Sequence, residues 1–222
     1  MVRTNSMVLE LGFQLQNFEM LNANSSKNES FNSHNLDNRH LLLMFICAHC
    51  PFVKYIENQI FTLSKEIENT VQTAAISSND IVTHPSDSPK NLRLQAQTQW
   101  WSFPNLYDEN QNFAKELKGL HPRFLSFSSE GDGEFLLYYH GQLDDSRPGN
   151  DIPLSGKDLR SAVKDLNQDN SYPSNQIPSL GCNIKWTPGK EPSWFKWIKM
   201  FFYPYKSGLG LIYSLCKYLH LL

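Results

Sequence analysis

A short apolar run that leads into two closely spaced cysteines constrains this chain more than any other feature. Residues 41–46 read LLLMFI, and such a continuous run is typical of a strand buried on both faces of a sheet. Cys47 follows directly, and Cys50 comes three positions later. Pro51 then opens a segment whose apolar residues recur every three or four positions as far as Ile67, which predicts a helix. The cysteines are therefore expected at a strand-to-helix junction.

The rest of the chain shows further alternating or helical patterns. We expect a short strand near Phe31 and an irregular segment over 173–192. Ser155 is expected to cap the last helix, with Asp158 three positions on. The other expected strands are 71–77, 124–128 and 134–140, and the other expected helices are 90–100, 109–118 and 155–168. This order predicts an α/β fold, with a central mixed sheet flanked by helices on both faces.

Composition narrows the class of protein. The chain has 222 residues, of which 40% are hydrophobic, which suits one domain with extensions. Its 20 basic and 22 acidic residues give a net charge of −2, so we expect no nucleic-acid partner. Four cysteines are too few for a disulfide-stapled secreted scaffold, and the N-terminus does not resemble a signal peptide. We therefore expect a cytoplasmic protein.

Two regions follow from the pattern. Residues 8–190 are expected to form the domain, and 193–222 an aromatic and hydrophobic C-terminal tail. Pro204, Lys206 and Lys217 interrupt the apolar residues of this tail. Since a membrane-spanning helix needs about 20 mostly apolar residues, membrane contact through the tail is not the favoured interpretation.

Two cysteines at a helix entry suit thiol–disulfide exchange. The free N–H groups of a helix N-terminus stabilise a thiolate, and the two-residue gap lets the second sulfur resolve a mixed disulfide. We expect Cys47 to be the exposed nucleophile with a lowered pKa and Cys50 to be the buried resolving thiol. His49 lies between them and is expected to favour the thiolate, which gives a midpoint potential more oxidising than the −270 mV or so of thioredoxin.

Other interpretations of these cysteines remain open. A metal site would need further ligands, and neither a second CxxC nor a spaced pair of histidines is present. Cys182 is either a third redox thiol or a small buried residue. Two inert buried cysteines are the plainest alternative. We expect neither a bound cofactor nor a metal.

Several stretches resemble one branch of the thioredoxin-like AhpC/TSA (redoxin) family. They include MFICAHCPFVKYI (44–56), AISSND (75–80), YHGQLDDSRPGN (139–150) and PSLGCNIKWTPGKEP (178–192), and FPNLYDE (103–109) and SGKDLR (155–160) match as well. The resemblance implies a thioredoxin fold and an antioxidant or oxidoreductase activity on protein or small-molecule thiols and disulfides. Electrons would come from a thioredoxin- or glutathione-type donor.

The chain also departs from related families. Peroxiredoxins carry a proline and a Thr or Ser ahead of their reactive cysteine, whereas His40 and Met44 occupy those positions here. A hydroperoxide reductase is therefore the alternative rather than the main function, and a metal-binding or non-catalytic module is the third. The thioredoxin fold places a cis-proline against the CxxC, and Pro122 is the candidate for that role. Segments 9–21 and 194–222 match the branch poorly.

A loop rich in charge follows the expected hairpin. Asp144, Asp145 and Arg147 lie between Gly141 and Pro148. An arginine flanked by carboxylates usually forms a surface ion pair of small energetic value. The alternative is that Arg147 faces the dithiol and helps to dock the substrate.

Overall fold

The computed structural model describes residues 3–5, 9–27, 29–119, 122–173 and 176–195. The chain divides into two compact units, Met1–Trp186 and Thr187–Leu222. The first unit contains all of the strands and helices named below. In the second unit, the described part includes a backbone hydrogen bond of 3.0 Å from Phe195 to the carbonyl of Pro192. The predicted boundaries, 8–190 and 193–222, stay predictions, and most of the expected tail lies outside the described residues.

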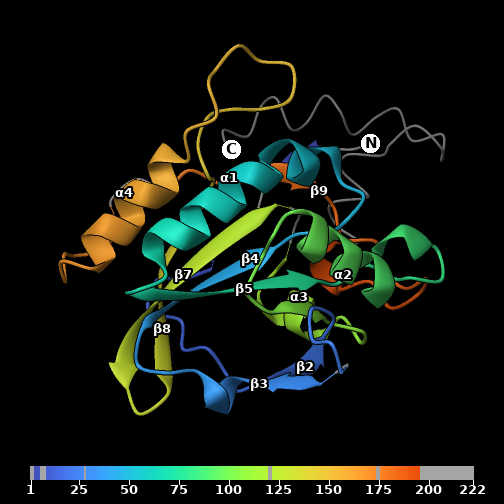
Figure 1. Cartoon of the computed structure of the whole chain (residues 1–222), viewed down its shortest axis with the longest axis horizontal. Helices are drawn as coiled ribbons and strands as arrows, with labels where there is room; N and C mark the ends of the chain where they lie inside the picture. The colour runs from blue at the N-terminus through green and yellow to red at the C-terminus, as the bar shows by residue number, and fades with distance from the viewer. Residues whose placement is uncertain (1–2, 6–8, 28, 120–121, 174–175, 196–222) are drawn as a thin grey trace. The chain divides into compact units, whose positions relative to one another are not determined.

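A seven-stranded mixed sheet forms the centre of the first unit (Figure 1). Its strand order is β3-β2-β6-β5-β4-β7-β8, in which β4, β5 and β6 run parallel and the other neighbours pair antiparallel. The strands are β2 (Glu19–Asn22), β3 (Ser30–Asn32), β4 (His40–Phe45), β5 (Val71–Ser77), β6 (Asn105–Tyr107), β7 (Arg123–Gly131) and β8 (Glu134–Gly141). The predicted mixed sheet is confirmed.

A second, two-stranded sheet joins distant parts of the chain. β1 (Arg3–Asn5) pairs antiparallel with β9 (Leu180–Cys182), with Arg3 opposite Cys182. Neither strand was predicted: β1 precedes the expected domain start at residue 8, and β9 lies within the segment expected to be irregular. Each has three residues, which is too short for a periodic pattern to appear.

Helices cover both faces of the large sheet. They are α1 (Pro51–Ile67), α2 (Pro89–Thr98), α3 (Asn112–Glu116) and α4 (Lys157–Leu166), with short 3-10 turns at Ser33–Asn35 and Pro85–Asp87. In Figure 1, α1 and α4 lie together above the sheet. Leu42 and Met44 of β4 share a buried cluster with these two helices, whereas the ring of Phe45 stacks on Phe113 of α3 at a centroid distance of 6.2 Å. The prediction that this strand is buried on both faces is confirmed.

Two predicted helices differ in extent. α3 spans five residues instead of the ten expected over 109–118. α4 begins at Lys157, and its N-cap is Gly156 at φ 65° instead of Ser155. A left-handed φ of this kind is easy only for glycine, which explains the residue type at the cap. The other expected elements lie where they were predicted, including the turn at Gly131-Asp132-Gly133.

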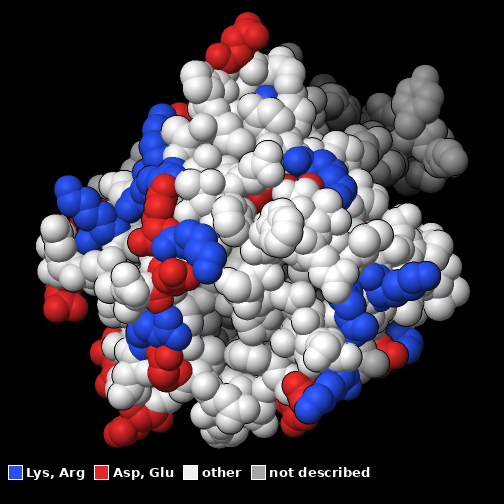
Figure 2. Space-filling model, viewed as in Figure 1, with Lys and Arg blue, Asp and Glu red and all other residues white. Residues whose placement is uncertain are grey.

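Charges of both signs are interleaved on the face that Figure 2 shows, most densely on the side where α4 lies in Figure 1. This face therefore has no large patch that is only positive or only negative. Among the described residues, no helix has the length and apolar character needed to cross a membrane.

Candidate active site

The two cysteines lie at the predicted junction. β4 ends at Phe45, and Cys50 is the N-cap residue of α1, where its carbonyl accepts the first helical hydrogen bond from the Lys54 amide at 2.9 Å. Cys47 and Cys50 are both 0% exposed. The location is therefore confirmed, and so is the burial of Cys50, but the predicted exposure of Cys47 is wrong.

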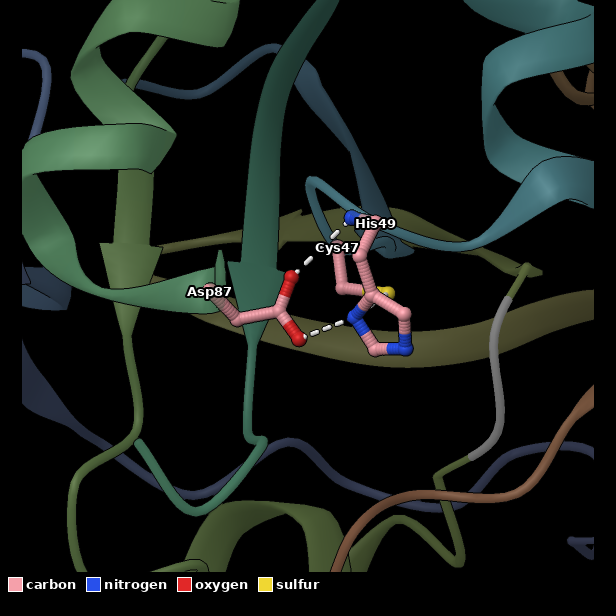
Figure 3. A group of neighbouring side chains, drawn as sticks. All are labelled: Cys47, His49 and Asp87. Atoms are coloured by element: carbon pink, nitrogen blue, oxygen red, sulfur yellow. Dashed lines mark hydrogen bonds and ion pairs between the residues drawn. The ribbon is translucent and has the colours of Figure 1, made fainter. Parts of the chain in front are cut away.

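A buried carboxylate holds the loop between the cysteines. Asp87 ends the 3-10 turn that precedes α2, and it is fully buried. Its Oδ1 accepts hydrogen bonds from the amides of Ala48 (2.9 Å) and His49 (3.1 Å). Its Oδ2 accepts one from the Asn79 side chain at 2.7 Å and lies 2.5 Å from His49 Nδ1 (Figure 3). These hydrogen bonds stabilise the negative charge of Asp87 away from water, and they fix the conformation of the loop between the cysteines.

The same carboxylate decides the electrostatics of the site. His49 Nδ1 lies 3.9 Å from Cys47 Sγ. Hydrogen bonding to Asp87 raises the pKa of His49. Burial raises the pKa of Cys47 well above its usual value, and the hydrogen bond to Cys50 and the negative charge of Asp87 act in the same direction. The predicted low pKa of Cys47 is therefore wrong, because the positive charge expected from His49 is balanced by Asp87 and the thiol lies out of water.

Cys47, His49 and Asp87 resemble a nucleophile–base–acid triad but do not have its geometry. In such a triad, one ring nitrogen faces the nucleophile and the other faces the carboxylate. Here Nδ1 is the nitrogen close to both partners. The arrangement therefore suits a hydrogen-bonded clamp on the loop better than a proton relay between sulfur and carboxylate.

The three side chains are also close enough to be considered as metal ligands, since their donor atoms all lie within 4.8 Å of one another. Two ligand atoms on one tetrahedral zinc lie about 3.3 Å apart when each bond is about 2.0–2.1 Å long. His49 Nδ1 and Asp87 Oδ2 are only 2.5 Å apart. As they stand, these two atoms are hydrogen-bonded to each other and do not have the spacing of two ligands on one zinc ion.

A second series of hydrogen-bonded side chains contacts the backbone of Cys47. The side-chain amide of Gln95 on α2 donates to the Cys47 carbonyl at 3.4 Å and to Glu57 Oε1 at 2.7 Å. Glu57 is 5% exposed, and its carboxylate also accepts from Lys54 at 2.8 Å. These hydrogen bonds join α1 and α2 to the backbone of the loop that contains Cys47.

A third cysteine reaches the site from β9. Cys182 is buried, and its Sγ lies 2.9 Å from Cys50 Sγ. The segment that follows is anchored to the end of β5: the Lys185 amide donates to Asn79 Oδ1 at 2.8 Å, and its carbonyl accepts from the Asp80 amide at 2.8 Å. The stretches that contain Asn79 and Cys182, which are 103 residues apart, therefore meet beside the dithiol.

Pro122 is buried at the start of β7, and its peptide bond to His121 falls outside the described residues. In the β4–β7 pairing Arg123 lies opposite Phe45, so the next position along this register brings Pro122 to Ile46, one residue before Cys47. Pro122 also lines a shallow pocket with Phe52 of α1 and Arg147. Its place is therefore the one expected of the proline beside the dithiol.

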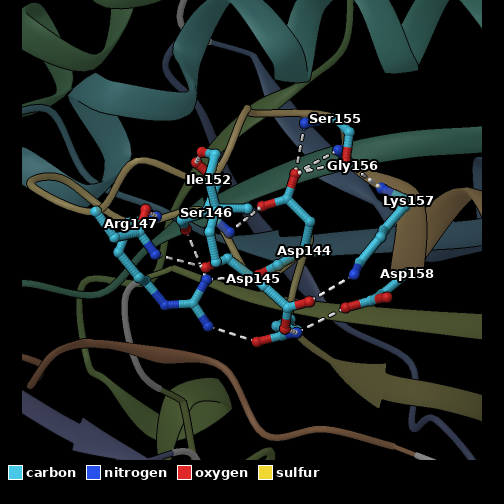
Figure 4. A network of polar contacts seen from close by, with 11 residues as sticks. Asp144, Asp145, Ser146, Arg147, Ile152, Ser155, Gly156, Lys157 and Asp158 are labelled. Atoms are coloured by element: carbon cyan, nitrogen blue, oxygen red, sulfur yellow. Dashed lines mark hydrogen bonds and ion pairs between the residues drawn. The ribbon is translucent and has the colours of Figure 1, made fainter.

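The loop 144–148 is held by its own hydrogen bonds (Figure 4). Arg147 donates to the carbonyls of Asp144 (2.5 Å) and Ser146 (2.6 Å) and to Gln142 Oε1. No ion pair of Arg147 is found among the described residues, so the expected surface ion pair is wrong. Asp145 pairs instead with Lys157, at 2.5 Å.

Sequence reasoning missed the residues that hold the dithiol. Asp87 stood in a loop marked only by its prolines, and nothing in the local pattern singled it out. One signal was available: parallel strands end at the same edge of a sheet, so the segment after β5 is expected near the segment after β4. Gln95 and Glu57 gave no such signal, because each lies within a helix.

Two solved structures match almost their whole length to this chain. An uncharacterized conserved protein from Geobacillus kaustophilus is 36% identical, with a TM-score of 0.79 over 85% of this chain and 98% of its own. A hypothetical protein from Sinorhizobium meliloti 1021 is 32% identical, with a TM-score of 0.77 over 84% and 100%. This chain belongs to their family.

A more distant match identifies the fold. The "C-terminal domain of putative thiol-disulfide oxidoreductase" from Bacteroides thetaiotaomicron is 15% identical, with a TM-score of 0.52 over 72% of this chain and 97% of its own. The predicted thioredoxin-like fold is thus confirmed for this chain. No protein-family model matches the chain, and no curated protein matches it.

Proposed function

We propose that the chain is a thiol–disulfide oxidoreductase that works through Cys47 and Cys50. The observation that carries the proposal is the placement of this dithiol at the β4–α1 junction, with Cys50 as the N-cap of the helix. The thioredoxin-like fold supports it, and so does the likeness to the thiol-disulfide oxidoreductase domain from Bacteroides thetaiotaomicron. On the motifs quoted above, we also propose membership of the AhpC/TSA branch, and the cytoplasm as the location.

The exchange proceeds through two sulfur displacements. Cys47 loses its proton, and its sulfur attacks one sulfur of a substrate disulfide, which releases the first substrate thiolate. Cys50 then attacks the Cys47 sulfur of the mixed disulfide, and the second substrate thiolate leaves. The substrate gains two electrons and two protons, and the protein acquires a Cys47–Cys50 disulfide. A thioredoxin- or glutathione-type thiol restores the dithiol by the reverse steps.

Access to Cys47 requires the loop to open, since the thiol is fully buried. The hydrogen bonds from Ala48 and His49 to Asp87 oppose this movement. Asp87 is therefore a positioning residue that controls how often the sulfur meets solvent, and His49, which is 26% exposed in its side chain, marks the edge of the site nearest to water.

The raised pKa of Cys47 bears on the midpoint potential of the dithiol. A dithiol is a strong oxidant when its reduced form is stabilised as a thiolate. Burial and Asp87 here favour the protonated thiol. We therefore expect a midpoint less oxidising than the value expected from His49 alone.

Hydroperoxide reduction has less support. Met44, at the position where peroxiredoxins carry a hydroxyl, is 1% exposed and belongs to the apolar core. No polar side chain at that position is available to bind a peroxide. Protein or small-molecule disulfides are therefore the proposed substrates, docked at the shallow pocket that Phe52, Tyr55 and Pro122 line.

A redox titration against glutathione tests the proposal. Trypsin leaves both thiols in the peptide 40–54, so the Cys47–Cys50 disulfide appears as a closed loop within one peptide. We expect this loop to form reversibly and to be absent in Cys47→Ser. In Cys50→Ser, a glutathione adduct should accumulate on Cys47, and Cys216→Ser is the matched control that should leave both results unchanged. The assignment is overturned if glutathione adds to Cys50 in Cys47→Ser but not to Cys47 in Cys50→Ser, or if the unaltered chain forms no reversible disulfide through Cys50.

A further inference from the structure

Cys182 is the nucleophilic group closest to the dithiol that the proposed exchange does not use. Its sulfur lies 2.9 Å from Cys50 Sγ, and a disulfide bond is about 2.05 Å long. The two sulfurs therefore need to approach by less than about 1 Å to bond. Cys50 thus has a sulfur neighbour on each side, because its thiol is also hydrogen-bonded to that of Cys47.

The position of Cys182 is fixed from both directions along the chain. On one side, β9 pairs with β1, so that the backbone of Cys182 lies opposite Arg3. On the other, Lys185 is bound through its backbone to Asn79 and Asp80, and its carbonyl also accepts from the Gln111 side chain at 2.9 Å. These contacts hold the Cys182 sulfur at a fixed distance from Cys50, which a reacting sulfur requires.

Building on the proposed function, we propose that Cys182 is a third redox thiol, which takes over the disulfide from Cys47 and stores it as a buried Cys50–Cys182 disulfide. The step is an internal exchange. The Cys182 sulfur attacks Cys50 Sγ in the Cys47–Cys50 disulfide, the Cys50–Cys182 bond forms, and the Cys47–Cys50 bond breaks. The proton lost by Cys182 ends on Cys47, so that no electrons enter or leave the protein.

The position of each sulfur indicates where a substrate disulfide enters. All three thiols are buried, Cys47 and Cys50 at 0% exposure and Cys182 at 3%, so none of them meets a substrate until the site opens. Cys47 is the thiol beside His49, the partly exposed side chain at the edge of the site. Burial raises the pKa of Cys47, and the hydrogen bond to Cys50 together with burial raises that of Cys182, so the attacking and the released sulfur both favour the protonated thiol. This internal exchange, which we call the relay, therefore returns Cys47 to the free thiol and leaves the disulfide between Cys50 and Cys182.

Peptide mapping of the oxidised full-length protein distinguishes the two disulfides. Trypsin places Cys182 in the peptide 165–185, so a Cys50–Cys182 disulfide joins it to the peptide 40–54, while a Cys47–Cys50 disulfide closes a loop within 40–54. After equilibration with oxidised and reduced glutathione, free thiols are alkylated in denaturant. We expect the joined peptides at no less than about one tenth of the loop form, a ratio that corresponds to about 1.4 kcal/mol, with Cys47 alkylated in them.

Three variants sharpen the outcome. In Cys182→Ser, only the loop should form, and Cys182→Ala provides a second variant, with thermal melting used to confirm that both are folded. In Cys47→Ser, the joined peptides should form at least tenfold more slowly, since the entry thiol is missing. The relay is wrong if the loop forms while the joined peptides stay below one tenth of it, or if Cys47→Ser joins them as fast as the unaltered chain. If neither disulfide forms, the proposed function itself fails.

Discussion

At the scale of single residues, Asp87 governs the site. Four hydrogen bonds converge on its two oxygens, and three of them come from Ala48 and His49 between the cysteines. Removing an acceptor from buried donors costs about 1–3 kcal/mol. We expect Asp87→Asn to lower the free energy of unfolding by about that amount and to speed alkylation of Cys47 in the native state, because the loop opens more often. Asp151→Asn, at an exposed site, is the matched control.

The pH dependence of this variant follows from the His49 pKa. Asp87 raises the pKa of His49 in the folded protein above the unfolded value of about 6.5. The resulting stabilisation is fully present below about pH 6.5 and is lost as the pH rises through the folded pKa. The difference in unfolding free energy between the unaltered chain and Asp87→Asn should therefore be largest below about pH 6.5 and shrink as the pH rises above it. Urea titrations at several pH values measure it, and a difference that stays constant would refute the His49–Asp87 coupling.

At the scale of elements, the start of α4 depends on a side chain from a preceding loop. The N-cap Gly156 has no side chain to offer, and Asp144 accepts from the amides of Ser155 (2.6 Å) and Gly156 (2.5 Å) in its place. The Asp144 carboxylate also accepts from the Ser146 amide at 2.9 Å, so one residue fixes both the loop and the helix end. Asp144 therefore has a structural role in this loop, and the hydrogen bonds of Arg147 to the Asp144 and Ser146 carbonyls hold the same loop.

Loss of this cap should cost stability without altering the redox chemistry. We expect Asp144→Ala to lower the free energy of unfolding by about 2–3 kcal/mol, since several buried amides lose their acceptor. Asp151→Ala in the same loop should change it by less than about 0.5 kcal/mol. Urea unfolding measures both. The glutathione midpoint should be the same in the two variants, and a midpoint that moves only in Asp144→Ala would mean that the loop acts on the dithiol.

At the scale of the whole molecule, features formed by residues close in sequence could be predicted, and contacts between distant residues could not. β4, α1 and β5 could be predicted because their periodic patterns lie within single segments, and the parallel pairing of β4 with β5 then follows from the intervening helix. The site could be predicted only in part. Cys47 and Cys50 are neighbours in sequence, whereas Asp87 lies 38 positions after His49 and Cys182 lies 132 positions after Cys50. Their proximity is a product of the completed topology, which no local pattern encodes.

The completed topology also predicts how much of the chain the activity requires. The unit Met1–Trp186 contains the entire seven-stranded sheet, the four helices and every residue of the candidate site. A chain that ends at Lys190 should therefore keep the urea midpoint and the Cys47–Cys50 exchange of the full chain. A chain that ends at Pro178 is the matched control, since it lacks β9 and with it the pairing with β1 and the Cys182 sulfur.

The two truncations separate the contributions of the segments that they remove. The shorter chain should unfold at lower urea and form only the Cys47–Cys50 loop, because the third thiol is gone. If the chain ending at Lys190 loses exchange while Cys47 and Cys50 remain reducible, residues 191–222 take part in the reaction. Since every contact described around the dithiol comes from residues before 187, we expect the boundary for full stability and for the Cys50–Cys182 disulfide to fall between the ends of these two chains.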